Sequence, residues 1–579
     1  MRTIWSLWQD AVAQERPNPA YLVEEADGWR EVSWAEAAQA VDELAHGLLS
    51  LGIGKGDAFG MLARTRLEWS LLDFALAQVG AVAAPIYPSS TATECSYILE
   101  HSNAVGCLVE NEEDRARIAA ARPEHVYTPE TLGELRALGR EHAAPNPDAL
   151  ERARSQIGDE DLFTFIYTSG TTGPPKACMI LNRNYYEMVG VIDRIEDFFL
   201  PEDVLFLYLP LAHNFGRFMH LLGAHVGFTI AFCPDPRRIG DLLPQVRPTI
   251  LPTVPRVLEK VHTGVLAKFA EASGAKRRLI DWALGVGRRT SVLRQQGKSL
   301  PPVLAVQHRI ADALVYSKVK ARLGGRMRAA ISGGAPLAKE IAEFFHMLDL
   351  LVLEGYGQTE CTTASNCNRP NRFKFGTVGP ALPGIEVTTA EDGEILVRGD
   401  TVFAGYHQDE EATHEVLPGD GWLHTGDVGV IDDQGFLTVT DRKKDIIVTA
   451  GGKNVSPQNI ENSLKNARWV SQALVVGDRR PYLTALITLD EDELAAWAAG
   501  KGLDGDVADL SQREEVRELI EEAVGEVNRD LAHFEQVRHF SILPRDFSAD
   551  ENEITPTLKL KRRVVEVHFG GEIEELYRD

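Results

Sequence analysis

Residues 167–176 concentrate groups that bind phosphate. Their sequence, Tyr-Thr-Ser-Gly-Thr-Thr-Gly-Pro-Pro-Lys, combines four serine or threonine hydroxyls with two glycines and one lysine. Glycine lets backbone N–H groups approach a phosphate closely, hydroxyls add donors, and lysine supplies a mobile positive charge. The apolar residues 162–166 directly before this stretch are typical of a buried strand. The pattern therefore predicts a polyphosphate-binding turn at the end of a strand.

The spacing in this stretch differs from that of the common P-loop, G-x-x-x-x-G-K-[ST]. Gly170 and Gly173 are too close together, and two prolines precede Lys176. Any five of these residues would be typical of a surface turn. All ten in this order resemble the phosphate-binding signature of the adenylate-forming superfamily, which contains acyl-CoA synthetases, luciferases and peptide-synthetase adenylation domains. Ala177 departs from that signature, where glycine is usual. The resemblance implies that Lys176 is catalytic, that Thr168 also binds magnesium, and that ATP is held by Thr168, Ser169, Gly170, Thr171, Thr172 and Gly173.

Two further segments resemble the adenine side of the superfamily's site. Residues 331–336 read Ile-Ser-Gly-Gly-Ala-Pro, which in isolation is typical of a turn. Residues 354–360 read Glu-Gly-Tyr-Gly-Gln-Thr-Glu, where a carboxylate would also suit a helix N-terminus. The resemblance implies that the adenine pocket includes Gly333, Gly334 and Ala335, that Tyr356 stacks on the base, that Gly357 and Gln358 bind the nucleotide, that Thr359 contacts the α-phosphate, and that Glu360 binds magnesium.

A third motif ends at Asp427, after Gly-Trp-Leu-His-Thr-Gly. Aspartate after glycine is common in loops. The resemblance implies instead that Asp427 binds both ribose hydroxyls with help from Arg442, and that Lys444 lies at the nucleotide and near a pivot between two domains.

A basic segment near the carboxyl end contains a candidate adenylation lysine. Residues 555–561 read Thr-Pro-Thr-Leu-Lys-Leu-Lys, and without context we would interpret them as a basic edge segment. They resemble the terminal motif whose lysine enters the active site during adenylation. Lys559 matches that lysine, and Lys561 stays an alternative because Leu558 stands where many relatives have glycine.

Several stretches favour a fatty acid as the substrate. Residues 86–90, 209–213, 251–256 and 448–456 resemble long-chain fatty acid CoA ligases more than activators of aryl or amino acids. His213 could be an ordinary core histidine, but the resemblance implies a catalytic position beside the acyl carboxylate. An acyl tunnel could be lined by Phe215, Phe218, Met219, Leu221 and Leu222, although such side chains are more often core. A long apolar chain needs such a channel because its burial is worth about 0.8 kcal/mol per methylene.

The elements around these motifs indicate an α/β protein. Residues 35–51 predict an amphipathic helix, and strands are expected at residues 58–62, 204–209, 249–251, 329–331 and 350–353. Residues 384–440 predict an all-β region, with strands at 393–398 and 435–440. Beyond it, strands at 473–476 and 483–489 accompany a helix that we expect to begin at a capping box formed by Ser511 and Glu514.

We therefore predict an adenylate-forming N-terminal domain at residues 1–440, with mixed and parallel sheets, helices and a small β subdomain at about 384–440. A smaller, mobile α+β C-terminal domain is expected at residues 441–579, with its hinge at about 441–445.

Composition excludes some classes of function. The 579 residues carry a net charge of -25, which disfavours non-specific nucleic acid binding because phosphate backbones would be repelled. Six cysteines without paired spacing, and an amino-terminal segment unlike a signal peptide, favour the cytoplasm. Peripheral contact with the inner face of a membrane stays open. Residues 260–307 are basic and helical, and we interpret them as a solvated face, with a rim that attracts acidic lipid or CoA phosphates as the alternative.

Together these observations predict a magnesium-dependent, AMP-forming long-chain fatty acid CoA ligase that uses ATP and coenzyme A. A carboxylate that attacks ATP is an anion approaching an anion, so magnesium and lysines must screen the charge. One alternative is a ligase that passes its acyl-AMP to a carrier protein. Another is a non-catalytic lipid or nucleotide sensor, which the presence of Lys176, Glu360, Asp427, Arg442 and Lys559 disfavours.

Overall fold

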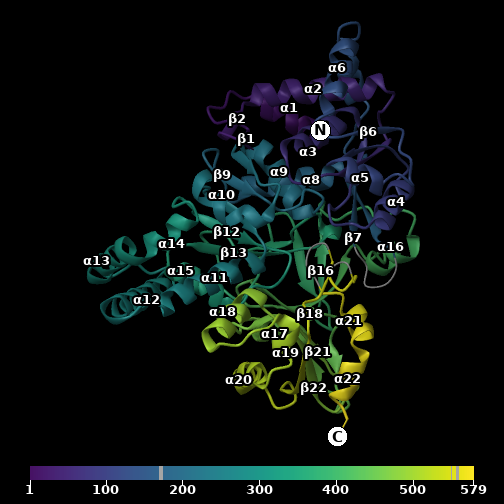
Figure 1. Ribbon diagram of the computed structural model, residues 1–579. Helices are drawn as coiled ribbons and strands as arrows, with labels where there is room; N and C mark the ends of the chain where they lie inside the picture. Colours follow the sequence, from purple (N-terminus) through teal and green to yellow (C-terminus); the bar gives the residue numbers. More distant parts are fainter. Residues whose placement is uncertain (169–173, 549–550, 556–559, 579) are drawn as a thin grey trace.

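The computed structural model describes residues 1–168, 174–548, 551–555 and 560–578. A large N-terminal domain, purple to green in Figure 1, lies above a smaller C-terminal domain in yellow-green and yellow. Both are built from sheets covered by helices. The predicted α/β fold class, with a large N-terminal and a smaller C-terminal domain, is thereby confirmed. The mobility of the C-terminal domain stays a prediction.

One sheet of the N-terminal domain has six strands. It is parallel except for its last pair, β7 and β8, which is antiparallel. Its central strand β3 is buried along its whole length, as expected for a strand covered on both faces. The order is β6 (His125–Tyr127), β5 (Ala104–Val109), β3 (Ala58–Leu62), β4 (Val82–Pro85), β7 (Leu162–Thr168) and β8 (Lys176–Leu181).

The second sheet has eight strands, and its central strands are parallel. Only the edge pairs β1–β2 and β13–β14 are antiparallel. The order is β14 (Asn366–Cys367), β13 (Leu351–Tyr356), β12 (Ala329–Ser332), β11 (Ile250–Thr253), β9 (Val204–Leu207), β10 (Thr229–Phe232), β1 (Tyr21–Glu25) and β2 (Gly28–Val32).

Helices cover these two sheets. The helix predicted at 35–51 is α2, whose amino-terminal N–H groups are capped by Ser33 and Glu36. The helices are α1 (Ile4–Val12), α2 (Trp34–Ser50), α3 (Leu67–Val79), α4 (Ala92–His101), α5 (Glu112–Arg117), α6 (Leu132–Ala143), α7 (Ala149–Arg154), α8 (Asn182–Gly190), α9 (Asn214–Val226), α10 (Ile239–Val246), α11 (Pro255–Ala270), α12 (Gly274–Gln295), α13 (Pro302–Ala311), α14 (Ser317–Arg322) and α15 (Lys339–Met347).

A buried ion pair fastens α9 to α3 and β7. Arg217 of α9 and Asp73 of α3 are both fully buried, and Arg217 Nε lies 3.0 Å from Asp73 Oδ2. Arg217 Nη1 also donates to Thr164 Oγ1 of β7 at 2.5 Å. The guanidinium lies over the ring of Phe163 at 4.4 Å. This cluster fixes the start of α9 relative to the strand that leads into residues 169–173.

The predicted β region forms a four-stranded antiparallel sheet of β15 (Glu386–Thr389), β16 (Glu394–Arg398), β17 (Leu423–Ile431) and β18 (Leu437–Arg442). The expectation that it is entirely β is wrong, because helix α16 (Glu410–Val416) interrupts it. Asp409 caps this helix by accepting the N–H of Ala412.

The C-terminal domain contains a two-stranded ribbon and a three-stranded sheet. Its strands are β19 (Ile447–Val448), β20 (Asn454–Val455), β21 (Val470–Val476), β22 (Leu483–Leu489) and β23 (Val537–Ile542). Its helices are α17 (Pro457–Lys465), α18 (Glu491–Lys501), α19 (Val507–Ser511), α20 (Glu514–Arg529), α21 (Arg562–His568) and α22 (Gly570–Glu575).

The capping box predicted at Ser511 is wrong. Ser511 is the last residue of α19, and its hydroxyl donates to the carbonyl of Ala508 at 2.7 Å. Helix α20 begins separately at Glu514 without a side-chain cap. Its apolar face is buried as expected, through Val516, Ile520 and Val524.

Candidate active site

Asp427 is the centre of a hydrogen-bond network that joins both halves of the predicted nucleotide site. It lies on β17 and is only 6% exposed. Its Oδ2 accepts from the Tyr356 hydroxyl at 2.7 Å and from Gln358 Nε2 at 2.5 Å. Its Oδ1 lies 3.4 Å from Arg442 Nε, because Asp427 and Arg442 are directly opposite on β17 and β18. The structure thus brings Tyr356 and Gln358 together with Asp427 and Arg442, which lie about 70 to 85 positions later in the sequence.

Burial and the neighbouring carboxylate raise the pKa of Tyr356 well above its ordinary value. Tyr356 therefore stays a neutral donor to Asp427. Gln358 is held in turn by a second hydrogen bond from Nε2 to the carbonyl of Thr425 at 2.9 Å. A carboxylate held this firmly is suited to accept hydrogen bonds from adjacent hydroxyl groups.

Lys176 and Glu360 both contact Tyr406. Thr168 and Lys176 are paired residues at the ends of β7 and β8, and Thr168 Oγ1 donates to the carbonyl of Lys176 at 3.4 Å. Lys176 Nζ lies 5.1 Å from the centre of the Tyr406 ring and 3.8 Å from Asp409 Oδ2. The Tyr406 hydroxyl donates to Glu360 Oε1 at 2.7 Å.

Tyr406 was not foreseen from the sequence. Burial and the Glu360 carboxylate raise the pKa of its hydroxyl far above the ordinary value, so it remains a donor. Across the described ranges, no lysine or arginine forms an ion pair with Glu360. Its second oxygen therefore keeps acceptor capacity for a cation.

The predicted adenine segments lie at the ends of neighbouring strands. Gly333 and Gly334 follow β12, and a Cβ on Gly333 would meet the ring of Phe215 at 3.5 Å. Gly334 has a φ of +86°, which favours glycine. A Cβ on Gly357 would lie 2.3 Å from the carbonyl oxygen of Thr363, so only glycine fits there. Ala335 continues the turn after β12.

Two buried polar atoms at these strand ends lack a hydrogen-bond partner among the described residues. They are Ser332 Oγ and Glu354 Oε1, which belong to paired residues of β12 and β13. Burial raises the pKa of Glu354 to about 7, and the N–H of Leu337 on its other oxygen opposes this. Unpaired buried oxygens are costly, which is consistent with a ligand at this place. Ser332 and Glu354 lie in the two predicted adenine segments, but nothing in those motifs marks either residue as a ligand-binding group.

His213 is held in one tautomer at the start of α9. Its Nδ1 accepts the backbone N–H of Phe215 at 3.1 Å, so the ring proton lies on Nε2. The next residue, Asn214, donates from Nδ2 to the carbonyl of Thr359 at 3.4 Å, which places His213 beside the 354–360 segment. Phe215 and Phe218 are partly exposed, whereas Met219, Leu221 and Leu222 are buried in the main core. The acyl-tunnel role of all five stays a prediction.

Some predicted site residues lie outside the described ranges: Ser169, Gly170, Thr171, Thr172, Gly173 and Lys559. The alternative lysine, Lys561, bonds through Nζ to Asn552 Oδ1 of the same domain. Lys444 is exposed and forms a 2.8 Å ion pair with Glu415 of α16.

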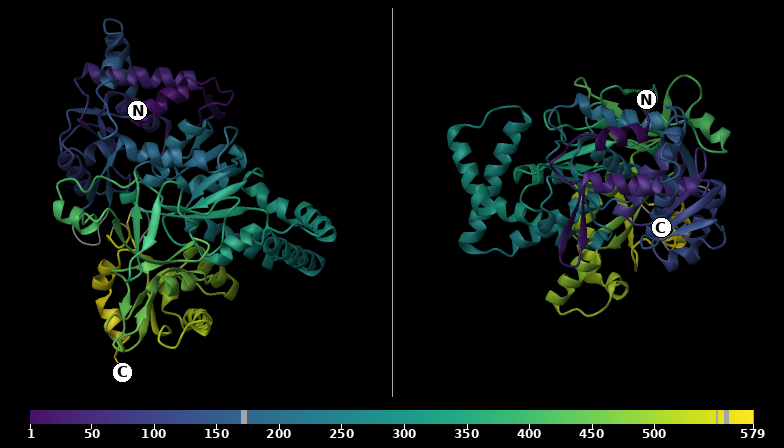
Figure 2. Two further views of the ribbon diagram at one scale, coloured as in Figure 1. Left: turned by 180° about the vertical axis from the view of Figure 1, so that it is seen from behind. Right: turned by 90° about the horizontal axis from the view of Figure 1, so that it is seen from above.

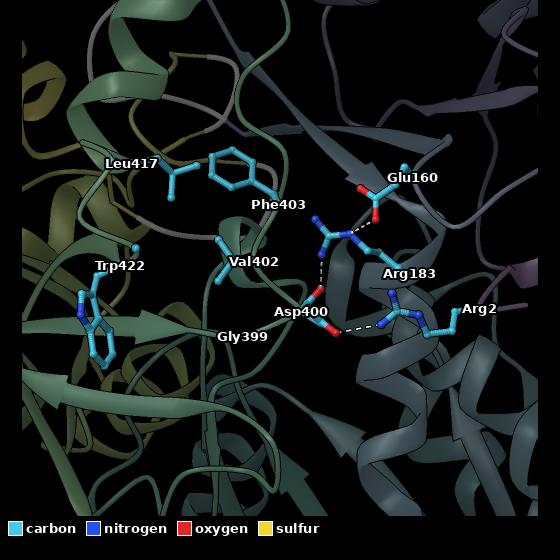
Figure 3. Close-up of a pocket in the computed structure, with 11 residues that line it drawn as sticks. Arg2, Glu160, Arg183, Gly399, Asp400, Val402, Phe403, Leu417 and Trp422 are labelled. Atoms are coloured by element: carbon cyan, nitrogen blue, oxygen red, sulfur yellow. Dashed lines mark hydrogen bonds and ion pairs between the residues drawn. The ribbon is translucent and has the colours of Figure 1, made fainter.

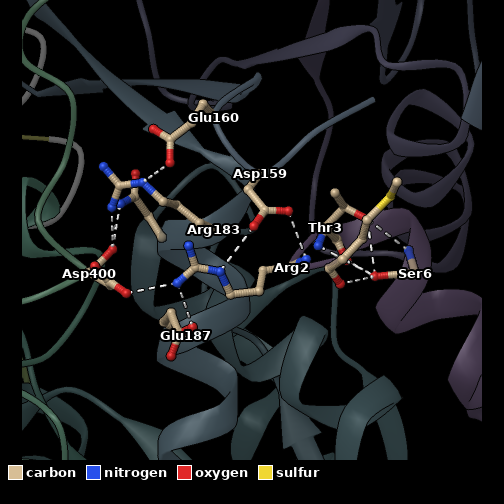
Figure 4. Close-up of polar contacts among 10 residues, drawn as sticks. Arg2, Thr3, Ser6, Asp159, Glu160, Arg183, Glu187 and Asp400 are labelled. Carbon is tan, nitrogen blue, oxygen red and sulfur yellow. Dashed lines mark hydrogen bonds and ion pairs between the residues drawn. The ribbon is translucent and has the colours of Figure 1, made fainter. Parts of the chain in front are cut away.

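A cavity of about 520 Å³ has none of these predicted residues in its lining, although the backbone N–H of its lining residue Phe403 donates to the carbonyl of Glu360 at 2.9 Å (Figure 3). It is lined by Arg2, Glu160, Arg183, Gly399, Asp400, Val402, Phe403, Leu417, Gly419, Gly421 and Trp422. Its charged side chains form ion pairs. Arg2 contacts three carboxylates, those of Asp159, Glu187 and Asp400, at 3.1, 3.0 and 2.8 Å (Figure 4). We interpret this cluster as a structural tie between the amino terminus, α8 and the β subdomain.

The fold and the site define a two-domain α/β nucleotide-binding protein. The chain belongs to the family of AMP-binding enzymes. The family model for the AMP-binding enzyme matches residues 8–407, and the model for the AMP-binding enzyme C-terminal domain matches residues 444–579. The superfamily recognised from the motifs is confirmed.

The sequence is similar to those of named CoA ligases over nearly its whole length. Long-chain-fatty-acid--CoA ligase FadD15 of Mycobacterium bovis is 38% identical over 582 residues, 97% of this chain and 95% of that protein. Long-chain-fatty-acid--CoA ligase 6 of Mus musculus is 32% identical and covers 94% of this chain and 82% of its own length. The crystal structure of the anthranilate CoA ligase AuaEII with anthranoyl-AMP has a TM-score of 0.73 at 19% identity, with 98% of this chain and 97% of that chain covered.

Proposed function

We propose that this protein is an AMP-forming long-chain fatty acid CoA ligase. It joins a fatty acid to the α-phosphate of ATP with release of pyrophosphate, and the thiol of coenzyme A then displaces AMP. The names of relatives that match nearly the full chain agree with this function, which the sequence also predicts. The observation that supports the proposal is the Asp427 network, in which one buried carboxylate contacts Tyr356, Gln358 and Arg442.

Each residue of the network has a proposed task. Asp427 accepts hydrogen bonds from the ribose hydroxyls, and Arg442 orients the Oδ1 atom of this carboxylate. Tyr356 stacks on the adenine, and the unpaired oxygens of Ser332 and Glu354 accept hydrogen-bond donors of the base. At a pKa of about 7, Glu354 is partly protonated at neutral pH, so it also has a proton to donate to a ring nitrogen.

The phosphate side would be held by Lys176, Thr168, Thr359 and residues 169–173. Oxygen ligands with few protein carboxylates suit magnesium, which usually keeps its remaining positions for phosphates and water. Glu360 fits this preference because it offers a carboxylate without a cationic partner among the described residues. Magnesium bound by Glu360 and Thr168 would screen charge on the phosphoryl oxygens.

His213 would position the fatty acid. Its Nε2 proton is directed by the Nδ1 hydrogen bond, so Nε2 donates to one carboxylate oxygen and leaves the other to attack the α-phosphorus. Lys559 would stabilise the adenylation transition state. The C-terminal domain then pivots near Lys444 for the thioester step, whose acceptor is coenzyme A.

The test is a pair of assays on the full chain with ATP and palmitate. We expect pyrophosphate release that depends on the fatty acid, followed by formation of palmitoyl-CoA when coenzyme A is added. Pyrophosphate release without any thioester would favour the acyl-AMP ligase that serves a carrier protein. ATP binding without release for any acid from short to long chain would favour the non-catalytic sensor.

A further inference from the structure

A helical arm at residues 274–322 projects from the N-terminal domain. It contains α12, α13, a π-helical segment at Asp312–Tyr316 and α14. In Figure 1 the tips of α12 and α13 are the far left of the molecule, and the view from above in Figure 2 shows the same separation from the body. The arm therefore presents surface that no other part of the described chain covers.

The arm has a positive charge in a strongly negative protein. It contains eleven lysines and arginines against two aspartates, a net +9, while the whole chain carries -25. Three of its cations form ion pairs, Arg277 with Asp281, Arg294 with Asp349 and Lys320 with Asp312. The other eight are exposed and have no carboxylate partner in the part of the chain that the structure describes: Lys276, Arg278, Arg288, Arg289, Lys298, Arg309, Lys318 and Arg322.

An apolar stripe runs along the outside of α13 and into the π-helical segment. Val303, Val306, Ile310 and Leu314 are 72%, 55%, 46% and 44% exposed. Their spacing of three and four residues places them on one face of the helix. The opposite face is already buried through Leu304, His308, Ala311 and Val315. These four side chains therefore do not belong to the hydrophobic core.

The stripe and the cations lie side by side. Arg289 of α12 donates to Gln307 Oε1 of α13 at 3.2 Å. Gln307 lines a shallow cavity of about 350 Å³ together with Pro302, Val303 and Val306. Arg309 and Lys318 belong to the same helical stretch as the stripe. Aliphatic side chains flanked by exposed arginine and lysine are the pattern of a helix that lies in a membrane interface.

We propose that this arm docks the protein on an anionic lipid surface. Val303, Val306, Ile310 and Leu314 enter the boundary between headgroups and acyl chains, and the cations beside them, Arg289, Arg309 and Lys318, contact the phosphates. No helix within the described ranges has the length and apolarity to cross a bilayer, so the arm would lie along the surface. Because of the exposed apolar stripe, we no longer interpret residues 260–307 as only a solvated face and favour the alternative, a rim that attracts acidic lipid. The proposal concerns a surface separate from the nucleotide site and does not depend on the proposed function.

The cations and the aliphatic stripe together favour a lipid surface as the occupant. Anionic headgroups complement the basic flanks, and the acyl boundary complements the aliphatic stripe. A second copy of this acidic chain would also attract the cations, and the experiment must therefore separate the two.

The test is flotation of the full-length protein with vesicles of phosphatidylcholine alone or mixed with phosphatidylglycerol. We expect binding to the mixed vesicles only, weakened by salt because headgroup contacts are screened. A variant with Val303→Ser, Val306→Ser, Ile310→Ser and Leu314→Ser should bind at least about tenfold less. Arg289→Gln with Arg309→Gln and Lys318→Gln should remove the preference for phosphatidylglycerol.

Val430→Ser with Val567→Ser is the matched control, since these valines are 62% and 78% exposed elsewhere on the surface. It should bind vesicles like the unmodified protein. Pyrophosphate release that depends on detergent-dispersed palmitate shows whether each variant is folded. If the unmodified protein releases no pyrophosphate, that result counts against the proposed function and not against the docking proposal. The docking proposal is overturned if the unmodified protein ignores anionic vesicles, or if the four-serine variant binds them equally. It is also overturned if the stripe instead holds a dimer that the serines dissolve.

Discussion

Replacing Asp73 with asparagine should strongly destabilise the N-terminal domain. Asparagine keeps the shape of the side chain but leaves the Arg217 guanidinium, which is fully buried, without a counter-charge. The remaining contacts are Thr164 Oγ1 and the rings of Phe163, Trp69 and Tyr185. None of these carries a negative charge.

The expected loss is about 3–5 kcal/mol in the free energy of unfolding, the usual cost of removing one partner of a buried ion pair. Arg217→Met combined with Asp73→Leu should recover most of this loss, because no buried charge is then left unpaired. The two sites are in direct contact, so the double variant should be far from additive.

Urea denaturation followed by tryptophan fluorescence measures the effect, since Trp69 lies 5.4 Å from the guanidinium. The control pair is Arg277 and Asp281, at 3.0 Å but about half exposed, where Asp281→Asn should cost about 0.5 kcal/mol or less. A loss below about 1 kcal/mol for Asp73→Asn, or a double variant that is no more stable than Asp73→Asn, would refute the assignment of this pair as a buried ion pair.

Three further predictions concern the proposed site. Lys559→Ala should abolish acyl-AMP formation but spare thioester formation from supplied acyl-AMP, with Lys561→Ala as the matched control; equal loss of both half-reactions would contradict the assigned role. Asp427→Ala should raise the KM for ATP by about 10- to 100-fold, the worth of hydrogen bonds to a charged group, and should remove discrimination between ATP and 2′-deoxy-ATP in initial-rate assays. A preserved preference for ATP would argue against ribose binding. Burial raises the pKa of Glu354 from 4.5 to about 7, so its contribution to stability is present below pH 4.5 and is lost as pH rises through about 7. Between pH 4.5 and about 7, the stability of Glu354→Gln should therefore rise relative to that of the unmodified protein. A difference in urea midpoint between the two proteins that stays constant over this pH range would contradict the prediction.

The sequence predicted elements best where a buried apolar run has clear ends. Strands β3 and β22 occur at the expected residues because each run is mostly apolar, is fully buried, and has an aspartate, Asp57 or Asp490, directly at one end. The errors arose where polar residues had two uses. Ser511 bonds the carbonyl of Ala508 within one helix instead of capping the next. Asp409 begins a helix in a region whose other segments alternate as strands.

The sequence motifs identified part of the hydrogen-bond network at Asp427. Asp427, Tyr356 and Gln358 were expected at the nucleotide, and the structure places Tyr356 and Gln358 within hydrogen-bonding distance of Asp427. That they contact a nucleotide stays a prediction. Tyr406 was not expected, because its contact with Glu360 joins residues 46 positions apart and nothing in the local sequence marks it. The same holds for Asp73 and Arg217, which are 144 positions apart.

The nucleotide site and the proposed pivot share one strand pair. Asp427 and Arg442 are partners on β17 and β18, and Lys444 follows two residues after Arg442. Beyond this ladder, contacts between the two domains include three exposed ion pairs, Lys444 with Glu415, Lys443 with Asp392 and Lys260 with Asp492, and one partly buried pair, Arg256 with Asp490. Exposed pairs add little net stability because water and salt screen them. The free energy that such pairs contribute to one domain arrangement is therefore small. A ligand that changes the contact between Asp427 and Arg442 would act two residues before Lys444, where the pivot is proposed. Given the proposed ribose role of Asp427 and the proposed pivot, we predict that a nucleotide at Asp427 biases the position of the C-terminal domain.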